Sequence, residues 1–131
     1  MKSDLESIIL TRQELQIMKV VWARGSANVR EVCDVISRKK TTAYTTILTL
    51  MGILESKGAL AHTRVGRAYV YRPLLSRRQA TRNQVRDLLK RFFDGNPKRL
   101  IENVLEDEDL EPDQIGAVRS LLESRTHHRI S

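Results

Sequence analysis

The stretch from Lys40 to Gly58 constrains the fold of this chain more than any other part of its 131 residues. Its apolar side chains have the spacing that places one stripe of a helix on a core, at Ile47, Leu50, Met51 and Leu54. We expect the hydroxyl-rich start of the stretch to cap this helix and Gly58, after Lys57, to end it. The stretch therefore predicts one helix around which the neighbouring segments pack.

The opposite face of this helix is made of short side chains, namely Thr45, Thr49, Gly52 and Ser56, with Leu48 on its flank. A solvated helix face normally carries Glu, Lys and Arg. Short side chains let a helix enter a groove deeply, and Thr offers a hydroxyl to phosphates or base edges and a methyl to thymine. We interpret the stretch as a recognition helix. Because Thr is a poor helix former, a permissive, loop-prone surface is the alternative.

Two capping-box patterns predict two helices before the recognition helix. Thr11 with Glu14 opens a helix that runs to about Ala23, and Asn28 with Glu31 opens one that runs to about residue 38. The expected inward side chains are Leu15, Met18, Val21 and Trp22 in the first helix and Val29, Val32, Cys33 and Ile36 in the second. The second helix, a basic turn and the recognition helix together predict a helix-turn-helix.

Two runs of strand-forming residues follow the recognition helix, at 59–64 and 67–72, separated by Val65-Gly66. They predict a β-hairpin with Arg64 and Arg67 crowding its tip. The side chains expected on or beside the core are Leu60, Tyr69 and Tyr71. A basic hairpin directly after a recognition helix is a wing, which lies along a phosphate backbone or reaches a minor groove.

The last third of the chain predicts three short amphipathic helices, from Ser76 to about Phe93, around residue 100, and from Pro112 onward. Such helices bury little alone, so we expect two copies of the chain to share a core through them. A self-contained unit packed on the preceding domain is the alternative. The expected interface residues are Val85, Leu88, Leu89, Phe92, Leu100, Ile101, Val104, Ile115, Val118 and Leu122.

The predicted fold is therefore mainly α with a small β-hairpin. A winged helix-turn-helix DNA-binding domain at 1–75 precedes a three-helix dimerisation domain at 76–131. The net charge of +7 agrees with a polyanion partner, because between Ser37 and Arg72 Glu55 is the single acidic residue among many Lys and Arg. The predicted DNA-binding residues are Lys39, Lys40, Tyr44, Thr45, Thr46, Thr49, Arg64 and Arg67, and Lys57 is expected to add a phosphate contact.

The sequence gives little support for an enzyme. It has no glycine-rich phosphate loop, no metal-ligating pair of histidines on a helix face and no nucleophile elbow, and its one cysteine, Cys33, cannot build a zinc site. The adjacent His127 and His128 near the end of the chain are weak evidence for a metal site. We expect no cofactor and no metal. The absence of a long apolar run and of a secretion signal predicts a cytoplasmic protein with no membrane insertion.

Several motifs resemble the bacterial penicillinase and methicillin-resistance repressors, a family of winged-helix regulators. The resemblance is carried by residues 11–22 (TRQELQIMKVVW), 43–51 (AYTTILTLM), 57–58 (KG) and 66–71 (GRAYVY). It implies a homodimeric repressor on a pseudo-palindromic double-stranded DNA operator, with Tyr44, Thr45, Thr46 and Thr49 reading DNA. It also implies control of β-lactam resistance genes and release by a membrane sensor-protease, with the cut between Asn103 and Val104, where Val104 replaces the family's Phe.

Two other functions are consistent with the same sequence. One is a protein-binding adaptor that uses a winged helix as a scaffold and meets an acidic partner through its basic face. The other is a DNA-binding regulator with a different inducer and no cleavage. Salt-dependent affinity for duplex DNA distinguishes the adaptor from the regulators.

Overall fold

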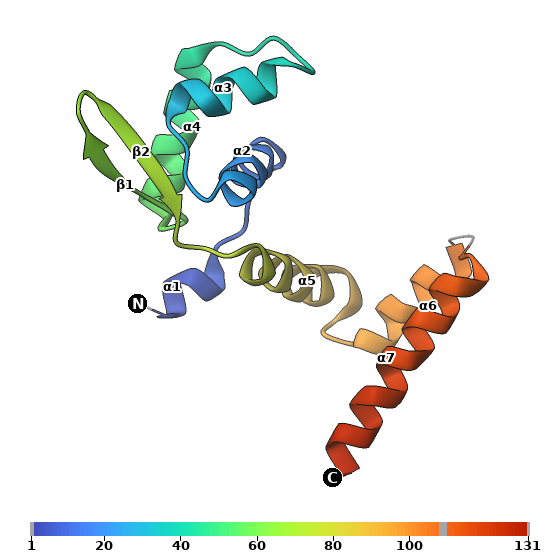
Figure 1. Ribbon diagram of the computed structural model, residues 1–131. Helices are drawn as coiled ribbons and strands as arrows, with labels where there is room; N and C mark the ends of the chain where they lie inside the picture. The colour runs from blue at the N-terminus through green and yellow to red at the C-terminus, as the bar shows by residue number, and fades with distance from the viewer. Residues whose placement is uncertain (1, 108–109, 131) are drawn as a thin grey trace. The chain divides into compact units, whose positions relative to one another are not determined.

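The structure is a computed structural model that describes residues 2–107 and 110–130, and the side chains of residues 5–106 and 110–125. Figure 1 shows its elements, which are α1 (Lys2–Ser7), α2 (Arg12–Arg24), α3 (Val29–Ser37), α4 (Tyr44–Lys57), β1 (Leu60–Val65), β2 (Ala68–Pro73), α5 (Arg77–Phe93), α6 (Pro97–Asp107) and α7 (Pro112–Ile130). The predicted mainly α fold with one hairpin and a winged helix-turn-helix is confirmed. The chain divides into two compact units, Met1–Leu88 and Leu89–Ser131, which are described separately below.

Both predicted capping boxes are present. The hydroxyl oxygen of Thr11 accepts from the backbone N–H of Glu14 at 3.1 Å, and the Glu14 carboxylate accepts from the N–H of Thr11 at 2.9 Å. Asn28 and Glu31 make the same reciprocal pair at 2.8 and 2.9 Å. These bonds satisfy N–H groups that have no partner inside the helix, so they fix where α2 and α3 begin.

Helix α4 ends as predicted but begins differently. Gly58 closes it in the left-handed conformation, with φ of 91°. The predicted hydroxyl cap is wrong, because the N-cap residue is Ala43 and no side chain in the described part of the chain makes a capping hydrogen bond to the helix. The nearest hydroxyl is used elsewhere: Thr42 donates to the carbonyl of Lys40 at 2.8 Å, which closes the turn from α3.

The hairpin pairs β1 and β2 antiparallel, with Val65 opposite Ala68. The turn is therefore Gly66-Arg67 rather than the predicted Val65-Gly66. Gly66 has φ of 63°, which suits the first central position of a type II′ turn. Ala27 and Tyr71 exchange two backbone hydrogen bonds of 2.9 Å, which attach the hairpin to the segment before α3.

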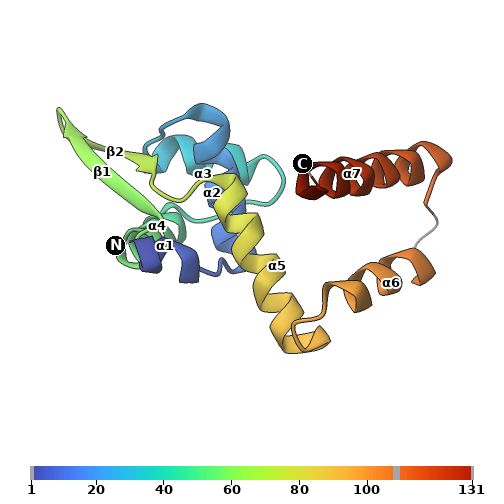
Figure 2. The same ribbon diagram turned by 90° about the horizontal axis from the view of Figure 1, so that it is seen from below.

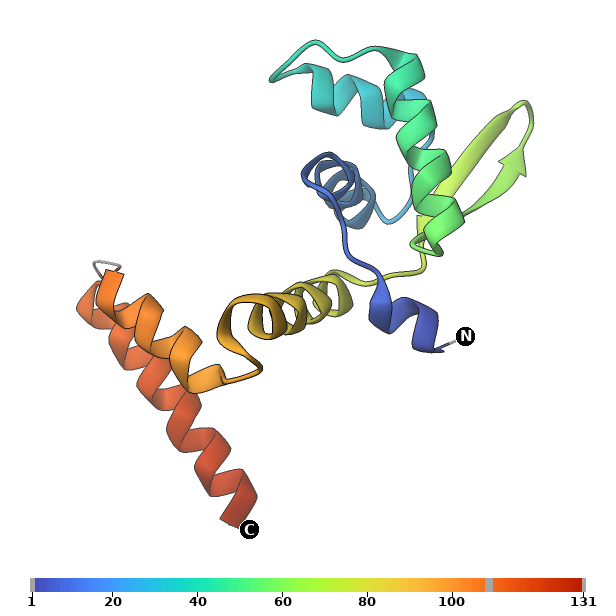
Figure 3. The same ribbon diagram turned by 180° about the vertical axis from the view of Figure 1, so that it is seen from behind.

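One core joins α2, α3, α4 and the base of the hairpin. Its buried members include Ile17, Met18, Val21, Val32, Ile47, Met51, Leu54, Leu60, Tyr71 and Leu75. Leu15, Trp22, Cys33, Ile36 and Leu50 are less buried than predicted. Tyr69 is 47% exposed, because it pairs with Arg64 near the tip of the hairpin, beyond the edge of the core. Figure 3 shows α4 between α3 and the hairpin.

The first half of α5 belongs to the winged unit. Asn83 is 3% exposed, and its amide nitrogen donates to the carbonyls of Leu5 and Ile8 at 2.7 and 3.0 Å. The boundary between the two compact units consequently lies after Leu88, inside α5. We predicted a boundary between residues 75 and 76, which separates a DNA-binding part from a dimerisation part. That division by function stays a prediction.

The second unit contains the end of α5, α6 and α7. Asp94 and Gly95, with φ of 49° and 76°, interrupt the helical conformation between α5 and α6. Among residues 89–106 and 110–125, no side chain is fully buried. Over the described part of the chain, no helix combines the length and apolarity needed to cross a membrane.

Candidate nucleic-acid interface

The predicted recognition face of α4 is exposed along its length. Thr45, Thr46 and Thr49 are exposed, and so are Gly52 and Ser56 further along the helix. The opposite face is buried through Ile47, Met51 and Leu54, as the spacing of the apolar residues predicted. Among the described residues the exposed face contains no acidic side chain. This exposed face, which we call the threonine ridge, is thus narrow and hydroxyl-bearing, and a groove of duplex DNA can accommodate it.

The first turn of α4 adds to this surface. Tyr44, the first helical residue, is 48% exposed. Among the described residues no side chain makes a capping hydrogen bond at Ala43, so the positive end of the helix dipole has no side-chain cap. Such a helix end suits an anionic group, and phosphate is the common one in protein–DNA contacts.

Lys39 and Lys40 lie in the turn between α3 and α4. Their backbone N–H groups donate to the carbonyl of Ile36 at 3.3 and 3.4 Å, which fixes the turn, while both side chains are exposed. The structure brings Lys39, Lys40 and Thr46 together as lining residues of one cleft. Neither lysine forms an ion pair within the described part of the chain.

Arg64 and Arg67 lie at the tip of the hairpin, which Figure 2 shows extending away from the helices of the winged unit. The Nε of Arg64 donates to the carbonyl of Gly66 at 3.1 Å, so this side chain lies back over the turn. Arg67 is itself a turn residue and is exposed. The two arginines therefore lie at the end of the hairpin opposite to Leu60 and Pro73.

Lys57, which we expected to add a phosphate contact, is ion-paired within the protein. Its ammonium group lies 2.6 Å from a carboxylate oxygen of Glu14 and donates to the carbonyl of Ile9 at 3.2 Å. Glu14 is a buried side chain. Lys57 is therefore committed to holding α4 against the start of α2, and a phosphate contact would have to compete with these bonds.

A side-chain contact that the sequence did not predict joins α4 to the wing. His62 Nδ1 on β1 lies 2.8 and 2.7 Å from the two carboxylate oxygens of Glu55 on α4. The imidazole is flanked by the rings of Tyr69 and Tyr71, with centroids 4.5 and 5.3 Å away. Burial, together with the charge of Glu55, raises the pKa of the Tyr71 hydroxyl. The available signal in the sequence was the placement of Glu55 and His62 on either side of the Gly58 stop.

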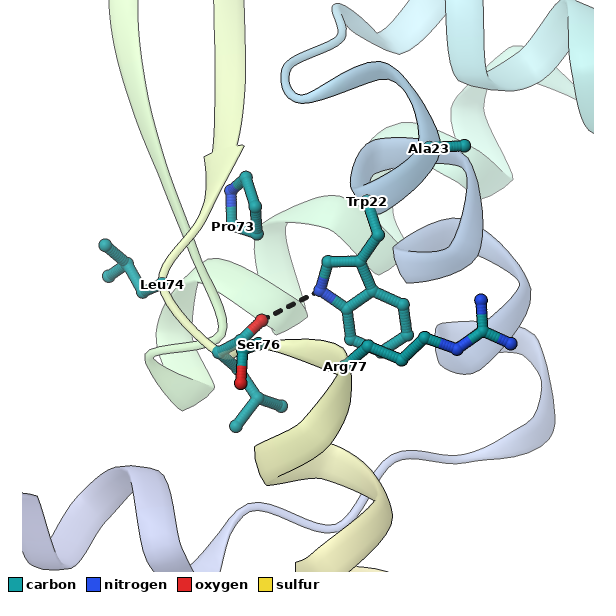
Figure 4. A pocket seen from close by; sticks show the side chains of 7 residues that line it. Trp22, Ala23, Pro73, Leu74, Ser76 and Arg77 are labelled. Atoms are coloured by element: carbon teal, nitrogen blue, oxygen red, sulfur yellow. Dashed lines mark hydrogen bonds between the residues drawn. The ribbon is translucent and has the colours of Figure 1, made fainter.

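Trp22 acts as a core anchor, as the sequence favoured. Its indole N–H donates to the carbonyl of Leu75 at 2.8 Å. Figure 4 shows the indole at one side of a hollow of about 460 Å³, with Pro73 and Arg77 among the other lining residues. The ring nitrogen is therefore satisfied within the protein, and the half-buried ring packs against the core.

The predicted interface residues lie on α5, α6 and α7. The exposed ones include Phe92, at 66%, and Val85, Ile101, Val104, Ile115, Val118 and Leu122, while Leu88, Leu89 and Leu100 are half-buried. The predicted cleavage residues Asn103 and Val104 are exposed and lie inside α6. The peptide bond between them is therefore part of a helix in this structure.

Comparison with known proteins identifies the family. The family profile described as "Penicillinase repressor" matches residues 10–124. The chain is 32% identical over 116 residues to the penicillinase repressor of Bacillus licheniformis, covering 88% of this chain and 91% of that protein. It is 22% identical over 122 residues to the methicillin resistance regulatory protein MecI of Staphylococcus aureus, covering 93% and 99%.

Among solved structures, the DNA-binding domain of the repressor BlaI aligns at 37% identity with a TM-score of 0.49, covering 53% of this chain and 85% of that one. The match of the family profile extends through both compact units and includes α2, α4 and the hairpin. The chain belongs to the penicillinase repressor family.

Proposed function

We propose that this protein is a DNA-binding transcriptional repressor that recognises an operator in duplex DNA. The observation that carries the proposal is the exposed threonine ridge of α4 next to Lys39 and Lys40, neither of which is ion-paired with any residue that the structure describes. Membership of a family whose relatives are named as repressors supports it. Neither feature suits catalysis, since the ridge offers hydroxyls without an adjacent base.

In this proposal the ridge and the cations have different tasks. Thr45, Thr46 and Thr49 contact base edges and thymine methyl groups, with Tyr44 beside them, and so contribute to sequence preference. The four cations at positions 39, 40, 64 and 67 contact phosphates, which contributes affinity for any sequence. Since a Thr hydroxyl discriminates poorly between bases, part of the preference comes from the shape of the groove.

We further propose that the repressor acts as a homodimer on a pseudo-palindromic operator. The support comes from the second unit, where seven large apolar side chains of α6 and α7 are 40–70% exposed and no described side chain is fully buried. A second copy that covers these side chains supplies the missing core. Linking two heads places the second at high effective concentration over a half-site about one helical turn away.

Release of DNA follows from this arrangement if the second unit is cut. We propose that a membrane sensor-protease cleaves between Asn103 and Val104 in response to β-lactams, and that the regulated genes confer β-lactam resistance. Because this bond lies inside α6, local unfolding must precede cleavage. Mass spectrometry of the protein from β-lactam-treated cells tests this step. Derepression with an intact chain would point to another inducer.

The primary test is selection of bound fragments from the organism's own genomic DNA, followed by fluorescence anisotropy with the selected duplex over a series of salt concentrations. The proposal predicts a preferred sequence with two-fold symmetry, and a log–log salt slope of several units. Weak binding to every duplex, with no salt dependence, would instead favour the adaptor. Placement of the selected sites over promoters, with reduced transcription, distinguishes a repressor from an activator.

A further inference from the structure

A cleft of about 730 Å³ lies between α2, α3 and α4, and we call it the α2–α4 cleft. Its apolar lining residues are all aliphatic: Ile17, Val20, Val35, Ile36, Ala43, Ile47 and Leu50. Ile17 and Ile47 are core residues, at 0% and 2% exposure. The cleft therefore brings part of the hydrophobic core of the winged unit close to the surface, and its size falls in the range of small-molecule sites.

The polar lining of the α2–α4 cleft has one sign of charge. Arg12 and Lys19 come from α2, Lys39 and Lys40 come from the turn before α4, and none of the described residues that line the cleft is acidic. All four side chains are exposed, and none forms an ion pair with another described residue. Clustered cations beside low-dielectric walls raise the local concentration of anions.

We propose that the α2–α4 cleft binds a small organic acid that has an aliphatic body and one carboxylate. The body covers the half-buried part of the aliphatic lining, at Val35, Ile36 and Leu50, and so removes apolar surface from water. The carboxylate meets the cations at the rim. An aliphatic body is favoured over an aromatic one because no ring lines the cleft for stacking.

The location of the cleft gives such a ligand a regulatory effect. Lys39, Lys40 and Thr46 line the cleft and are also residues of the proposed DNA interface. A carboxylate that engages these lysines competes with phosphate, so ligand and duplex weaken each other's binding by the same factor. This effect, unlike the binding itself, rests on the proposed function. It would make the ligand an inducer that acts without cleavage.

The binding test uses the full chain, ¹⁵N-labelled, in heteronuclear NMR titrations with octanoate, with its neutral analogue octanamide, and with acetate, which lacks the aliphatic body. We expect octanoate to shift the amide signals of residues that line the cleft and to saturate. Octanamide and acetate should each bind about tenfold more weakly, because each lacks one of the two matching features. Equal affinity for octanoate and octanamide, or shifts that avoid the cleft, would overturn the proposal.

A pair of variants tests the role of charge. Lys19→Gln should lower the affinity for octanoate about threefold, as expected for the loss of one exposed ion pair, and leave the affinity for octanamide unchanged. Arg30→Gln, which removes an exposed cation of α3 outside the cleft, is the matched control and should change neither affinity. Equal effects of the two variants on octanoate would mean that net charge, and not the cleft, attracts the ligand, which would contradict the proposal.

A second measurement separates this inference from the proposed function. Octanoate is titrated into the complex with the selected duplex, and octanamide serves as the control. We expect octanoate to release the duplex and octanamide to leave it bound. If no duplex binds in the first place, the proposed function fails while NMR still decides whether the cleft binds the acid. If octanoate occupies the cleft and the duplex remains bound, the regulatory effect is refuted.

Discussion

Lys57 Nζ at the last turn of α4 lies 2.6 Å from Glu14 Oε1 in the first turn of α2, 43 residues away in the sequence. The same carboxylate oxygen accepts the backbone N–H of Thr11 at 2.9 Å. Glu14 therefore has two tasks, since it completes the capping box of α2 and anchors the recognition helix. The Glu14 side chain is 3% exposed and that of Lys57 is 33% exposed, so the pair is partly shielded from water.

We predict that Glu14→Gln lowers the free energy of unfolding at pH 7 by about 1–3 kcal/mol, because it removes a charge-assisted hydrogen bond from a buried site. Urea denaturation followed by circular dichroism measures the change. Glu102→Gln is the control, because Glu102 forms an exposed pair with Lys98 at 3.7 Å. Loss of such a pair changes the free energy of unfolding by about 0–1 kcal/mol. Equal effects of the two variants would contradict the role assigned to Glu14.

The effect of Glu14→Gln should also depend on pH. Burial acts to raise the pKa of the Glu14 carboxyl, but the hydrogen bonds and charge of Lys57 and the bonds from Thr11 outweigh it, so the pKa is lowered from 4.5. Ionised Glu14 therefore contributes full stability above the pKa of the unfolded chain, and this contribution is lost as pH falls through the folded-state pKa. Denaturation at pH 7, 5 and 3 should show the wild type and the variant converging at the lowest pH. A constant difference would refute the electrostatic origin.

Arg67→Ala should weaken binding to all duplex sequences alike. Arg67 lies in the exposed turn of the wing, where a phosphate contact carries no base information. Loss of one contact should reduce the magnitude of the log–log salt slope by about 0.9. Anisotropy with the selected operator and with an unrelated duplex measures both effects, and Arg119→Ala on α7 is the matched control. A changed sequence preference with an unchanged slope would show that Arg67 reads bases.

Thr49→Val should alter sequence preference more than general affinity. Valine keeps the shape of the side chain and removes its hydroxyl, so one hydrogen bond worth about 0.5–1.5 kcal/mol is lost at the bases that Thr49 contacts. Competition among single-base variants of the operator measures the preference. Thr81→Val on α5 is the control, since the Thr81 hydroxyl donates to the carbonyl of Arg77 within its own helix. Uniform weakening across all operator variants would place Thr49 on phosphate instead.

Val118→Asp should convert the dimer to a monomer. Val118 is 40% exposed on α7, and in the proposed dimer an aspartate there would bury an unpaired charge. Light scattering measures the mass, and circular dichroism reports whether the helices persist. Ser120→Asp, at an exposed polar position of the same helix, should remain dimeric. A wild-type chain that is already monomeric would refute the proposed assembly.

Local interactions account for what the sequence predicted well. The capping boxes of α2 and α3 and the Gly58 stop depend on residues within a few positions of one another, so their spacing is sufficient to identify them. The face of α4 that is buried followed from apolar periodicity in the same way. The exposure of the threonine ridge could be predicted too, because the ridge lies on the side of α4 opposite to the buried face.

The differences from the sequence predictions have two physical origins: one depends on a partner far away in the sequence, and the others depend on which of two local arrangements the chain adopts. Lys57 looks like a free cation until the fold brings Glu14 to it. Thr42 looks like a helix cap, but its hydroxyl bonds the carbonyl of Lys40 instead. The hairpin turn lies one residue later than predicted, because Gly66 at its first central position permits a type II′ turn. The role of each predicted DNA contact stays a prediction, because a side chain's exposure does not identify its ligand.

The contact between Glu55 and His62 has a consequence for any attempt to redesign operator preference. It couples the helix that would read bases to the strand that would carry the phosphate-binding tip, and the buried Tyr71 supports it from β2. A substitution that tilts α4 in the major groove would also swing the hairpin. New specificities should therefore be sought by selecting changes in both elements together.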